Sequence, residues 1–452
     1  MQLRKIKWKD HPIIGDLSLD FVNSANNKPY STILLAGENG TGKSTILETI
    51  SSFLNYGKYE YFDLIEYSID DVIYRTTSPV YSNFDAKNKT FFDIIDENNN
   101  ITKIRHDRIY NTSEIDKEIN DLRYYGCVYS KARSDYKTRS INSTMTTELD
   151  KNKHDIDQEE DFTSLKQLIV DVENQDYYSY SQINITQGDN PQSWNTFYPN
   201  SKLFRFKNAF NNFFEKLKYD KVVDINSEKT IIFSKNNHSI PIDKLSTGEK
   251  QIVFRGAFLL RNTSILDDAI IMIDEPELSM HPKWQRKILN YYKQLFSTFG
   301  QQTAQIIFAT HSDHVLKEAL SDNMNNIVIT LEENNGVITS RNINMPSVLP
   351  MITTAETTYL AFGVLSNDYH TELYGFLQDK HNCRSVKHLD NFIINQTQYD
   401  ITKHKCISNH GNTQYESLCT YIRNAIHHPD SGNTFTEAQL KDSINLLIKL
   451  CR

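Results

Sequence analysis

The sequence lacks any run of about 18 apolar residues, the length that a helix needs to cross a membrane. We therefore expect no transmembrane helix. Cysteine is scarce, because the 452 residues include only five cysteines, which are scattered and lack CxxC spacing. They predict reduced thiols in a cytoplasmic protein. The N-terminal residues MQLRKIKWKDHP alternate charged and apolar types, which is typical of a first strand and not of a signal peptide.

An excess of basic charge is also absent. The formal net charge of -8 argues against a surface that coats nucleic acid generally, although local basic patches are compatible with it. In range 202–218 the phenylalanines share one helical face, which favours a core helix over a base-stacking surface. A looser cluster of cationic residues is a candidate contact for nucleic-acid phosphates. The alternative is an ordinary solvated surface. The cluster consists of Arg123, Lys131, Arg133, Lys137 and Arg139.

The strongest motif is GENGTGKS in range 37–44, which follows an apolar run and precedes a helical pattern. Its glycines let backbone N–H groups converge on phosphate oxygens, and the following helix adds its positive dipole end. Lys43 can then reach the β and γ phosphates, while Ser44 offers a hydroxyl to Mg²⁺. The ATP-binding residues predicted here are Gly37, Asn39, Gly40, Thr41, Gly42, Lys43, Ser44 and Thr45.

Two later apolar runs end in polar residues, as buried parallel strands do at the edge where ligands bind. The run AIIMIDEPE ends with Asp274, a predicted Mg²⁺ ligand beside Ser44, and Glu275, which is placed to activate the attacking water. The run QIIFAT is followed by His311, a second catalytic candidate that could contact the γ phosphate or the water. Taken alone, Glu275 could instead be a solvated surface acid, and His311 could be a histidine with a role only in packing.

The heptapeptide LSTGEKQ, range 245–251, places small polar residues at the start of a helix, an arrangement that suits an anion. The predicted anion-binding residues are Leu245, Ser246, Thr247, Gly248 and Glu249. Without a partner, the same residues would form an ordinary helix cap.

These four motifs, in their order along the chain, resemble the Walker A, signature, Walker B with D-loop, and His-switch elements of ABC-type ATPases, in the SMC-like and RecF-like branch. The resemblance implies an α/β fold with an ABC-type (SMC-like) P-loop ATPase head, an inserted segment and a small all-α C-terminal domain. It also implies ATP and Mg²⁺ as cofactors. The signature of one subunit would cover ATP bound by a second subunit, so a homodimer or higher homo-oligomer is expected. No clear Q-loop glutamine is present, and Ser130, Lys131 or Arg133 could replace it.

The motif positions predict a discontinuous head in ranges 1–95 and 203–345. Range 96–202 would be an insertion, with short helical pieces at 113–122 and 162–172 and a flexible loop at about 138–161. Range 350–452 would form the helical C-terminal domain, whose last helix starts after Thr434 or Thr436.

Within this last range, YIRNAIHHPD resembles the Arg, polar, three residues, His pattern of HEPN-type helical domains, many of which cleave RNA. Arg423, Asn424 and His428 are the residues that would form such a site, which would stabilise phosphate charge and transfer protons. The alternative is a helix cap or a subunit contact. The nearby His and Cys residues do not follow the spacing of a tetrahedral zinc site.

The whole chain resembles the ATPase subunits of bacterial antiphage systems, particularly PtuA of Septu and retron-associated systems. This resemblance implies a separate HNH nuclease partner, similar to PtuB, and a retron reverse transcriptase with its msDNA as a further candidate. No HNH or Toprim signature is found in this sequence. Three functions stay open: a regulatory ATPase for a partner nuclease, an ATP-gated ribonuclease, and a RecF-like DNA repair ATPase.

Overall fold

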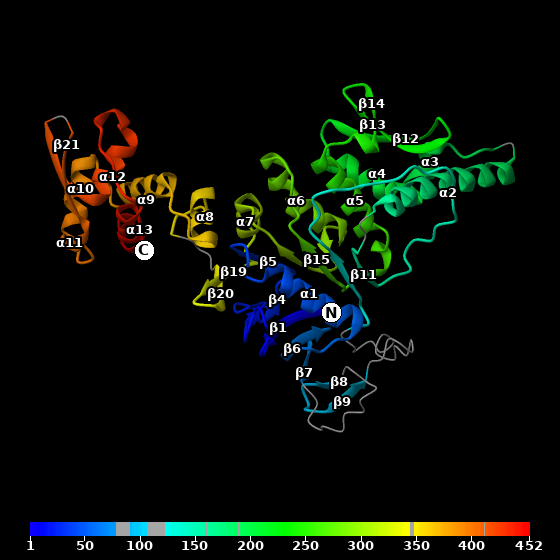
Figure 1. Ribbon diagram of the computed structural model, residues 1–452, viewed down its shortest axis with the longest axis horizontal. Helices are drawn as coiled ribbons and strands as arrows, with labels where there is room; N and C mark the ends of the chain where they lie inside the picture. The colour runs from blue at the N-terminus through cyan, green and yellow to red at the C-terminus, as the bar shows by residue number, and fades with distance from the viewer. Residues whose placement is uncertain (78–90, 106–122, 159–160, 189, 344–347, 411) are drawn as a thin grey trace. The chain divides into compact units, whose positions relative to one another are not determined.

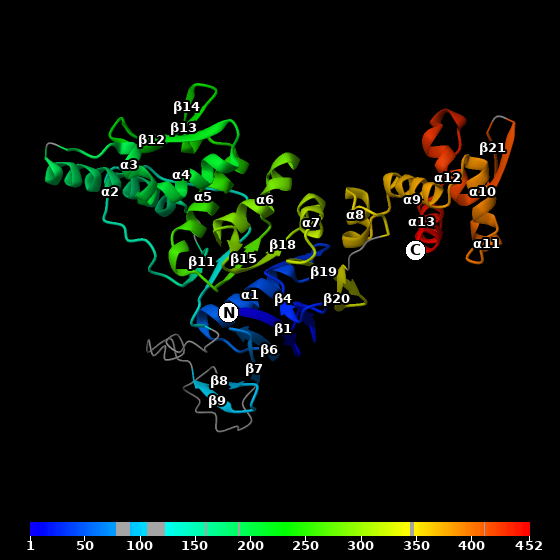
Figure 2. The same cartoon turned by 180° about the vertical axis from the view of Figure 1, so that it is seen from behind.

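The computed structural model describes residues 1–452 except 78–90, 106–122, 159–160, 189, 344–347 and 411. The chain divides into two compact units, Met1–Arg341 and Asn342–Arg452 (Figures 1 and 2). All five cysteines are free thiols. Within the described ranges, no helix combines the length and apolar character needed to cross a membrane.

A seven-stranded sheet forms the centre of the first unit. Its order is β11 (His154–Ile156), β10 (Cys127–Ser130), β15 (Ile270–Asp274), β18 (Gln305–Ala309), β5 (Thr32–Gly37), β19 (Asn326–Asn334) and β20 (Val337–Ile343). Every pair from β11 to β19 is parallel. The four strands from β10 to β5 are buried along their whole length, because both faces of the sheet are covered. The predicted α/β class is confirmed.

A second, six-stranded sheet packs with the first. Its order is β2 (Ser18–Asp20), β1 (Gln2–Trp8), β6 (Phe62–Ile69), β7 (Val72–Thr77), β8 (Phe91–Ile95) and β9 (Ile101–Arg105). The first strand predicted from the N-terminal alternation is confirmed. Side chains such as Trp8 and Tyr67 from this sheet, Ile33 from β5, and Phe53 from helix α1 (Lys43–Tyr56) share one core.

The remaining longer elements of this unit include α2, α4 and α5, which pack together, and three strands that lie next to α2 and α4 (Figures 1 and 2). They are α2 (Thr163–Gln187), α3 (Trp194–Phe197), η3 (Tyr198–Asn200), α4 (Lys202–Phe213), β12 (Leu217–Ile225), β13 (Glu228–Lys235), β14 (His238–Pro241), η4 (Ile242–Lys244), α5 (Thr247–Leu260), η5 (Thr263–Ile265), α6 (Pro282–Leu295) and α7 (Asp313–Leu320). Short strand pairs complete the unit: β3 (Val22–Asn23) with β4 (Lys28–Pro29), which lies beside β1, and β16 (Ser297–Thr298) with β17 (Gln301–Gln302). Phe206, Phe210 and Phe213 of α4 are buried, so the predicted core role of these aromatics is confirmed.

The predicted insertion, 96–202, needs correction. Strands β10 and β11 fall inside it yet belong to the central sheet, since β10 pairs with β15 from Cys127↔Ile270 to Ser130↔Ile273. The boundary at 95 also separates β8 from β9, which pair with each other. The helix predicted at 162–172 continues to Gln187, whereas the one at 113–122 lies outside the described residues.

The loop predicted to be flexible, about 138–161, has defined contacts in its described part. The backbone N–H of Met145 and the hydroxyl of Thr147 donate hydrogen bonds to Asp171 of α2, at 2.8 and 2.9 Å. Asp150 accepts two hydrogen bonds from the guanidinium of Arg205, at 2.9 and 2.8 Å. The polar composition of this segment led to the prediction of a flexible loop. In the structure, hydrogen bonds that involve Asp150 and Asp171 attach the segment to α2 and α4.

The second unit is mainly helical around its own core. Its elements are α8 (Thr354–Phe362), α9 (Asn367–Lys380), α10 (Val386–Ile394), α11 (Ile401–His404), β21 (Lys405–His410), β22 (Thr413–Ser417), α12 (Leu418–His427), η6 (Pro429–Ser431) and α13 (Glu437–Cys451). The hairpin β21–β22 corrects the all-α prediction. Buried Asp390 accepts hydrogen bonds from the N–H groups of Glu416 and Ser417, both at 3.0 Å, and so fixes β22 just before α12. Thr436 caps α13 in a capping box, as predicted.

Candidate functional site

The loop between β5 and α1 has the conformation that its glycines permit. Gly40 and Gly42 have φ angles of 89° and 84°, in the left-handed region. A Cβ atom on Gly42 would lie 2.4 Å from Cγ2 of Ile14, so no side chain fits there without displacement. All the predicted ATP-binding residues lie at the end of β5, on this loop or in the first turn of α1; they are Gly37, Asn39, Gly40, Thr41, Gly42, Lys43, Ser44 and Thr45.

Lys43 is buried with its ammonium group against main-chain oxygens. Its Nζ donates to the carbonyl oxygens of Gly37 at 2.9 Å and Glu38 at 2.8 Å. Burial lowers the pKa of Lys43 to about 8, although the carboxylates of Asp274 and Glu275 act in the opposite direction. Among the described residues, the Lys43 ammonium group donates hydrogen bonds only to main-chain oxygens, so a phosphate anion beside it would stabilise its charge.

Asp274, at the carboxyl end of β15, meets Ser44 in the first turn of α1. Burial raises the pKa of Asp274, while a hydrogen bond from Ser44 opposes the shift. The hydroxyl of Tyr129, at the end of β10, also interacts with the Asp274 carboxylate. A carboxylate and a hydroxyl of this kind are hard oxygen ligands, so the pair fits the Mg²⁺ ion that the sequence predicted.

Glu275 and His311 lie next to each other, as the sequence predicted for two groups at one strand edge. His311 Nε2 is 3.7 Å from Oε1 of Glu275. Burial and the positive charge of Lys43 lower the pKa of His311, so its ring is neutral at pH 7 and can accept as well as donate a hydrogen bond. Glu275 has a φ of 44°, a strained backbone for a non-glycine residue, held by the hydrogen bond from its N–H to Ala309 O at 2.8 Å.

Glu277 was not predicted as a site residue, yet it connects the two strands that carry the acid and the histidine. Its buried carboxylate accepts hydrogen bonds from Thr310 Oγ1 and from the backbone N–H of His311, both at 2.8 Å. Burial raises its pKa, and these two hydrogen bonds oppose the shift. The contact fixes the backbone of His311 relative to the loop after β15.

Arg255 is a second residue that the sequence analysis missed. Its guanidinium donates to the main-chain oxygens of Asp274 at 2.9 Å, Glu275 at 3.1 Å and Lys131. Gln251, one turn earlier on α5, donates to Pro276 O at 3.2 Å. Arg255 is the only charged residue in the apolar range 252–260, and that isolation was the available signal.

The signature residues form a helix cap in the single chain. Ser246 caps α5, and its hydroxyl and N–H donate to Oε2 of Glu249, each at 2.9 Å. Ser246 and Thr247 are exposed, whereas Leu245 is buried. A Cβ atom on Gly248 would lie 2.7 Å from Ser279 O, so α5 begins close to the D-loop of its own chain. The cap alternative therefore describes the single chain, and an anion role requires a second one.

The three Q-loop candidates differ in their surroundings. Arg133 Nη2 is 3.4 Å from Asp157 Oδ1, and Lys131 Nζ is 3.9 Å from Glu48 Oε1. Ser130 Oγ is buried and has no hydrogen-bond partner within the described chain. Ser130 pairs with Ile273, so its side chain lies on the sheet face opposite Asp274, whereas Tyr129, which pairs with Met272, shares the face of Asp274.

The basic cluster around the loop is largely neutralised. Arg123 is fully buried and donates to the Leu54 and Asn55 carbonyls at the end of α1, at 2.7 and 3.1 Å, so its prediction as a phosphate contact was wrong. Lys137 lies 3.5 Å from Asp135, and Arg139 lies 2.6 Å from Asp161. These pairs correspond to the solvated-surface alternative.

In the second unit, Arg423, Asn424 and His428 lie on α12 and at its C-terminal cap. Arg423 Nη1 donates to Asn424 Oδ1 at 3.0 Å, and Asn424 Nδ2 is buried without a hydrogen-bond partner among the described residues. The ring of His428 stacks on that of His410 from β21, with centroids 4.1 Å apart. The hairpin therefore adds an imidazole that the sequence pattern did not indicate. Within the described ranges, no group of three or more His, Cys, Asp or Glu residues could hold a metal.

A family model described as "AAA domain, putative AbiEii toxin, Type IV TA system" matches residues 33–317. The chain belongs to this AAA-domain family. The match runs from β5 through the glycine-rich loop, α5 and the ends of β15 and β18 into α7. The predicted enzyme class of this AAA protein, an ATPase, is confirmed.

Two relatives carry ATPase names. The "Retron Ec83 probable ATPase" of Escherichia coli is 32% identical over 103 residues, which is 21% of this chain and 18% of that protein. The "Retron Vc95 probable ATPase" of Vibrio cholerae serotype O1 biovar El Tor is 25% identical over 390 residues, 71% of this chain and 72% of that protein. The match to this chain therefore spans only 18% of the Retron Ec83 protein but 72% of the Retron Vc95 protein.

Solved structures whose backbone resembles that of this chain include SMC head domains. The SMC head domain from Thermotoga maritima has a TM-score of 0.38 at 12% identity, over 76% of this chain and 100% of that chain. An SmcHead bound to the C-winged helix domain of ScpA has a TM-score of 0.40 at 14% identity, over 76% and 99%.

Proposed function

We propose that this protein is the ATP-binding and ATP-hydrolysing subunit of a cytoplasmic antiphage defence complex in bacteria. ATP clasped between two heads would control assembly and so restrain or license a nuclease effector. The observation that carries the proposal is the convergence of Lys43 with Asp274, Glu275 and His311 at one edge of the central sheet. The retron names of the two relatives support the defence context.

Each residue at this edge has a role that follows from its surroundings. Lys43 exchanges its carbonyl partners for phosphate oxygens when ATP binds. Ser44 and Asp274 would hold Mg²⁺, which supplies neutralising charge to the phosphates. Glu275 orients the attacking water and accepts its proton, while neutral His311 hydrogen-bonds the water or the γ phosphate.

The second head supplies the rest of the site. Ser246 and the N-terminus of α5 would face the γ phosphate of ATP held by the partner, since they are exposed and point a positive dipole end outward. ATP then stabilises the dimer because it binds residues of both chains, and hydrolysis weakens it. The state of the nucleotide thereby sets the assembly state.

We propose as partners an HNH nuclease similar to PtuB and a retron reverse transcriptase with its msDNA. The chain itself offers a nucleic-acid contact at most locally, because the cations of the basic cluster are buried or paired with carboxylates. The nuclease activity of the complex would then reside in the partner.

Two variants test the head. Lys43→Ala should lose ATP binding, whereas Glu275→Gln should bind ATP normally and accumulate as an ATP-dependent dimer, because only the hydrolysis step is impaired. Fluorescent-nucleotide titration and light scattering with and without ATP measure these outcomes. Equal ATP affinity in Lys43→Ala and the wild type, or a Glu275→Gln protein that stays monomeric with ATP, would refute the shared site.

A second candidate function, ribonuclease action of the C-terminal unit, is favoured by the pairing of Arg423 with Asn424 and of His428 with His410. An arginine and a histidine are suited to stabilise phosphate charge and to move a proton at a ribose 2′-OH. Expression in cells should then cause RNA loss that Arg423→Ala and His428→Ala abolish. RNA loss that persists in both variants would remove this candidate.

A further inference from the structure

Glu277 is a buried acid at the edge of the central sheet, and the proposed mechanism gives it no role. It lies in the loop between β15 and α6, and only 8% of the residue is exposed. Its Oε1 accepts two hydrogen bonds, whereas Oε2 is buried and accepts none from the described residues. A buried carboxylate that is satisfied at one oxygen contributes little net stability, so its presence favours a role beyond stability.

The two hydrogen bonds hold the short connection between β18 and α7. Because β18 ends at Ala309 and α7 begins at Asp313, this connection consists of residues 310–312. The hydroxyl of Thr310 and the N–H of His311 donate to Oε1 of Glu277, both at 2.8 Å. The Thr310 hydroxyl also accepts a hydrogen bond from the N–H of Ser312 at 3.1 Å. One carboxylate oxygen and one hydroxyl therefore fix the whole connection.

The imidazole of His311 depends on this backbone for its position. Its Nε2 lies 3.7 Å from Oε1 of Glu275, which is longer than a hydrogen bond, so Glu275 does not hold the ring. The His311 side chain is also 32% exposed, so packing restricts it only in part. The direction in which the ring points thus follows from the backbone that carries it.

We propose that Glu277 is a positioning residue for ATP hydrolysis, which holds the backbone of His311 so that the imidazole meets the γ phosphate or the attacking water. This role rests on the function proposed for His311. An ionised carboxylate is a stronger acceptor than a neutral oxygen, so it holds the two donors more firmly. Because its Oε1 is engaged by Thr310 and His311, Glu277 acts through the histidine.

Steady-state kinetics and ATP affinity of four variants test the proposal. Glu277→Ala removes the acceptor and should lower kcat about tenfold or more, with ATP affinity within about twofold of the wild type. Glu277→Gln keeps an oxygen that can accept both hydrogen bonds, so its kcat should stay within about threefold of the wild type. Thr310→Val removes one donor and should lower kcat less than Glu277→Ala.

A double variant separates positioning from a general structural effect. His311→Ala alone should lower kcat about 10²-fold or more. Adding Glu277→Ala to it should cause no further loss of kcat, because a residue that acts through the histidine then has nothing left to position.

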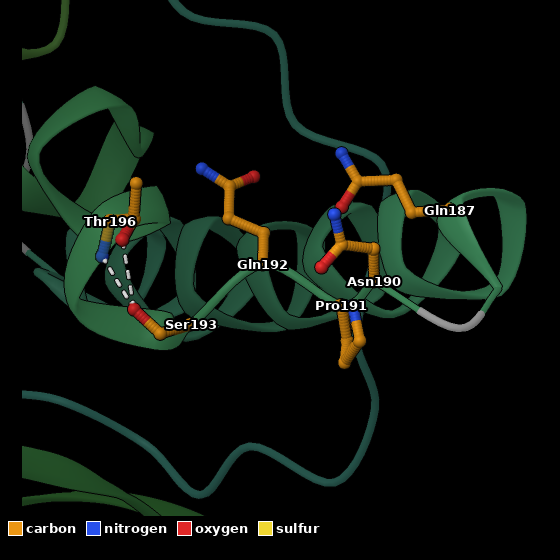
Figure 3. Close-up of a pocket in the computed structure, with 6 residues that line it drawn as sticks. All are labelled: Gln187, Asn190, Pro191, Gln192, Ser193 and Thr196. Atoms are coloured by element: carbon orange, nitrogen blue, oxygen red, sulfur yellow. Dashed lines mark hydrogen bonds between the residues drawn. The ribbon is translucent and has the colours of Figure 1, made fainter.

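Helix α2 supplies a matched control. Its buried Asp171 accepts hydrogen bonds from the N–H of Met145 at 2.8 Å and from the hydroxyl of Thr147 at 2.9 Å, the same kinds of donor that Glu277 binds. Beyond Asp171 the helix runs to an open cavity of about 640 Å³, shown in Figure 3. The lining of this cavity is uncharged and includes no residue of the proposed ATP site; it consists of Gln187, Asn190, Pro191, Gln192, Ser193 and Thr196. We therefore expect Asp171→Ala to be less stable than the wild type, like Glu277→Ala, but to hydrolyse ATP at the wild-type rate.

Several results would overturn the role of Glu277. Wild-type kcat in Glu277→Ala or in Thr310→Val would do so, and so would an equal loss in Asp171→Ala, which would show a general effect on folding. Glu277→Gln as slow as Glu277→Ala would mean that the charge matters and not the accepted hydrogen bonds. A further loss of kcat in the double variant would show that Glu277 acts independently of His311. In all these cases a slow His311→Ala would leave the proposed ATP site intact, whereas wild-type kcat in His311→Ala would remove the role of the histidine itself.

Discussion

Nη2 of Arg255 donates a hydrogen bond to the main-chain oxygen of Asp274 at 2.9 Å, so the signature helix is attached directly to the strand that carries the proposed magnesium ligand. The same guanidinium also bonds the oxygens of Glu275 and Lys131. Any shift of α5 on contact with a second head would therefore reach the backbone of both acids. We therefore propose Arg255 as a positioning residue for ATP hydrolysis.

We expect Arg255→Met to lower the ATP hydrolysis rate about tenfold or more while ATP binding is largely kept, since misplacing reacting groups by a fraction of an ångström has effects of this size. The carbonyls left without donors should also cost about 2 kcal/mol of stability. Separate measurements of kcat and of ATP affinity show whether the hydrolysis rate falls while ATP binding is kept. Arg261→Met, at the C-cap of the same helix and paired with Asp155, is the control and should hydrolyse ATP at the wild-type rate. Equal loss in both variants would mean a general effect on folding.

We expect Lys235 to help the signature residues bind an anion, because it neutralises the carboxylate of Glu249. Its Nζ is 2.9 Å from Oε1 of Glu249, whose carboxylate lies against Ser246. Burial would raise the pKa of Glu249, but hydrogen bonds from Lys235 and Ser246 outweigh it and hold that pKa below its ordinary value, so the group is an anion at pH 7. Without Lys235, this charge would oppose an incoming triphosphate.

The corresponding variant is Lys235→Met, which should weaken ATP-dependent dimerisation of the Glu275→Gln background several-fold, or about 1 kcal/mol. Adding Glu249→Gln should restore it, because the opposing charge is gone. Lys229→Met, on the same strand and paired with Asp224, should have no effect. Light scattering across an ATP titration gives the comparison, and a double variant as weak as the single one would disprove the charge argument.

The P-loop glycines allow a test of steric fit. Gly40→Ala and Gly42→Ala both place a side chain at positive φ. Only the second would collide, with Ile14 at 2.4 Å, because no atom of the described residues lies within 4 Å of a Cβ at Gly40. We expect ATP affinity to fall clearly more for Gly42→Ala, because the loop must shift to accommodate the methyl group. Isothermal titration with ATP measures both. Equal affinities would show that the loop rearranges freely.

His370 should make stability depend on pH. Burial lowers its pKa to about 3, below the ordinary 6.5, and its Nε2 is hydrogen-bonded to Ser443 Oγ at 2.8 Å. Its unfolded form takes up a proton below pH 6.5 that the folded form refuses until about pH 3, so stability is lost as pH falls through this window. From pH 7 to 5 the loss should be about 2 kcal/mol.

Denaturant unfolding of the wild type and of His370→Gln at the two pH values measures this contribution. Glutamine can retain a polar nitrogen near the Nε2 position but does not titrate. The variant should therefore lose less stability on acidification than the wild type. An identical pH dependence would show that other groups account for it.

Much of the head could be predicted because its signals are local. A glycine-rich loop between an apolar run and a helical pattern specifies a strand, a loop and a helix, and β5 and α1 follow that pattern. The capping box of Ser246 and Glu249 is equally a matter of residues three apart. The residues around the site that were missed act over longer separations: Arg255 reaches Lys131 across 124 positions, and Glu277 reaches His311 across 34.

The sequence by itself determined the phosphate-binding loop, the acid-bearing strand and the enzyme class. These features depend on the spacing of nearby glycines and on an apolar run that ends in acids, and neither requires knowledge of distant residues. Only the tertiary structure decided that β10 belongs to the central sheet, that Arg123 is a buried helix cap and that His410 meets His428. Sheet order and the pairing of buried charges arise from contacts between segments far apart in the chain. Periodicity within any one segment carries no information about them.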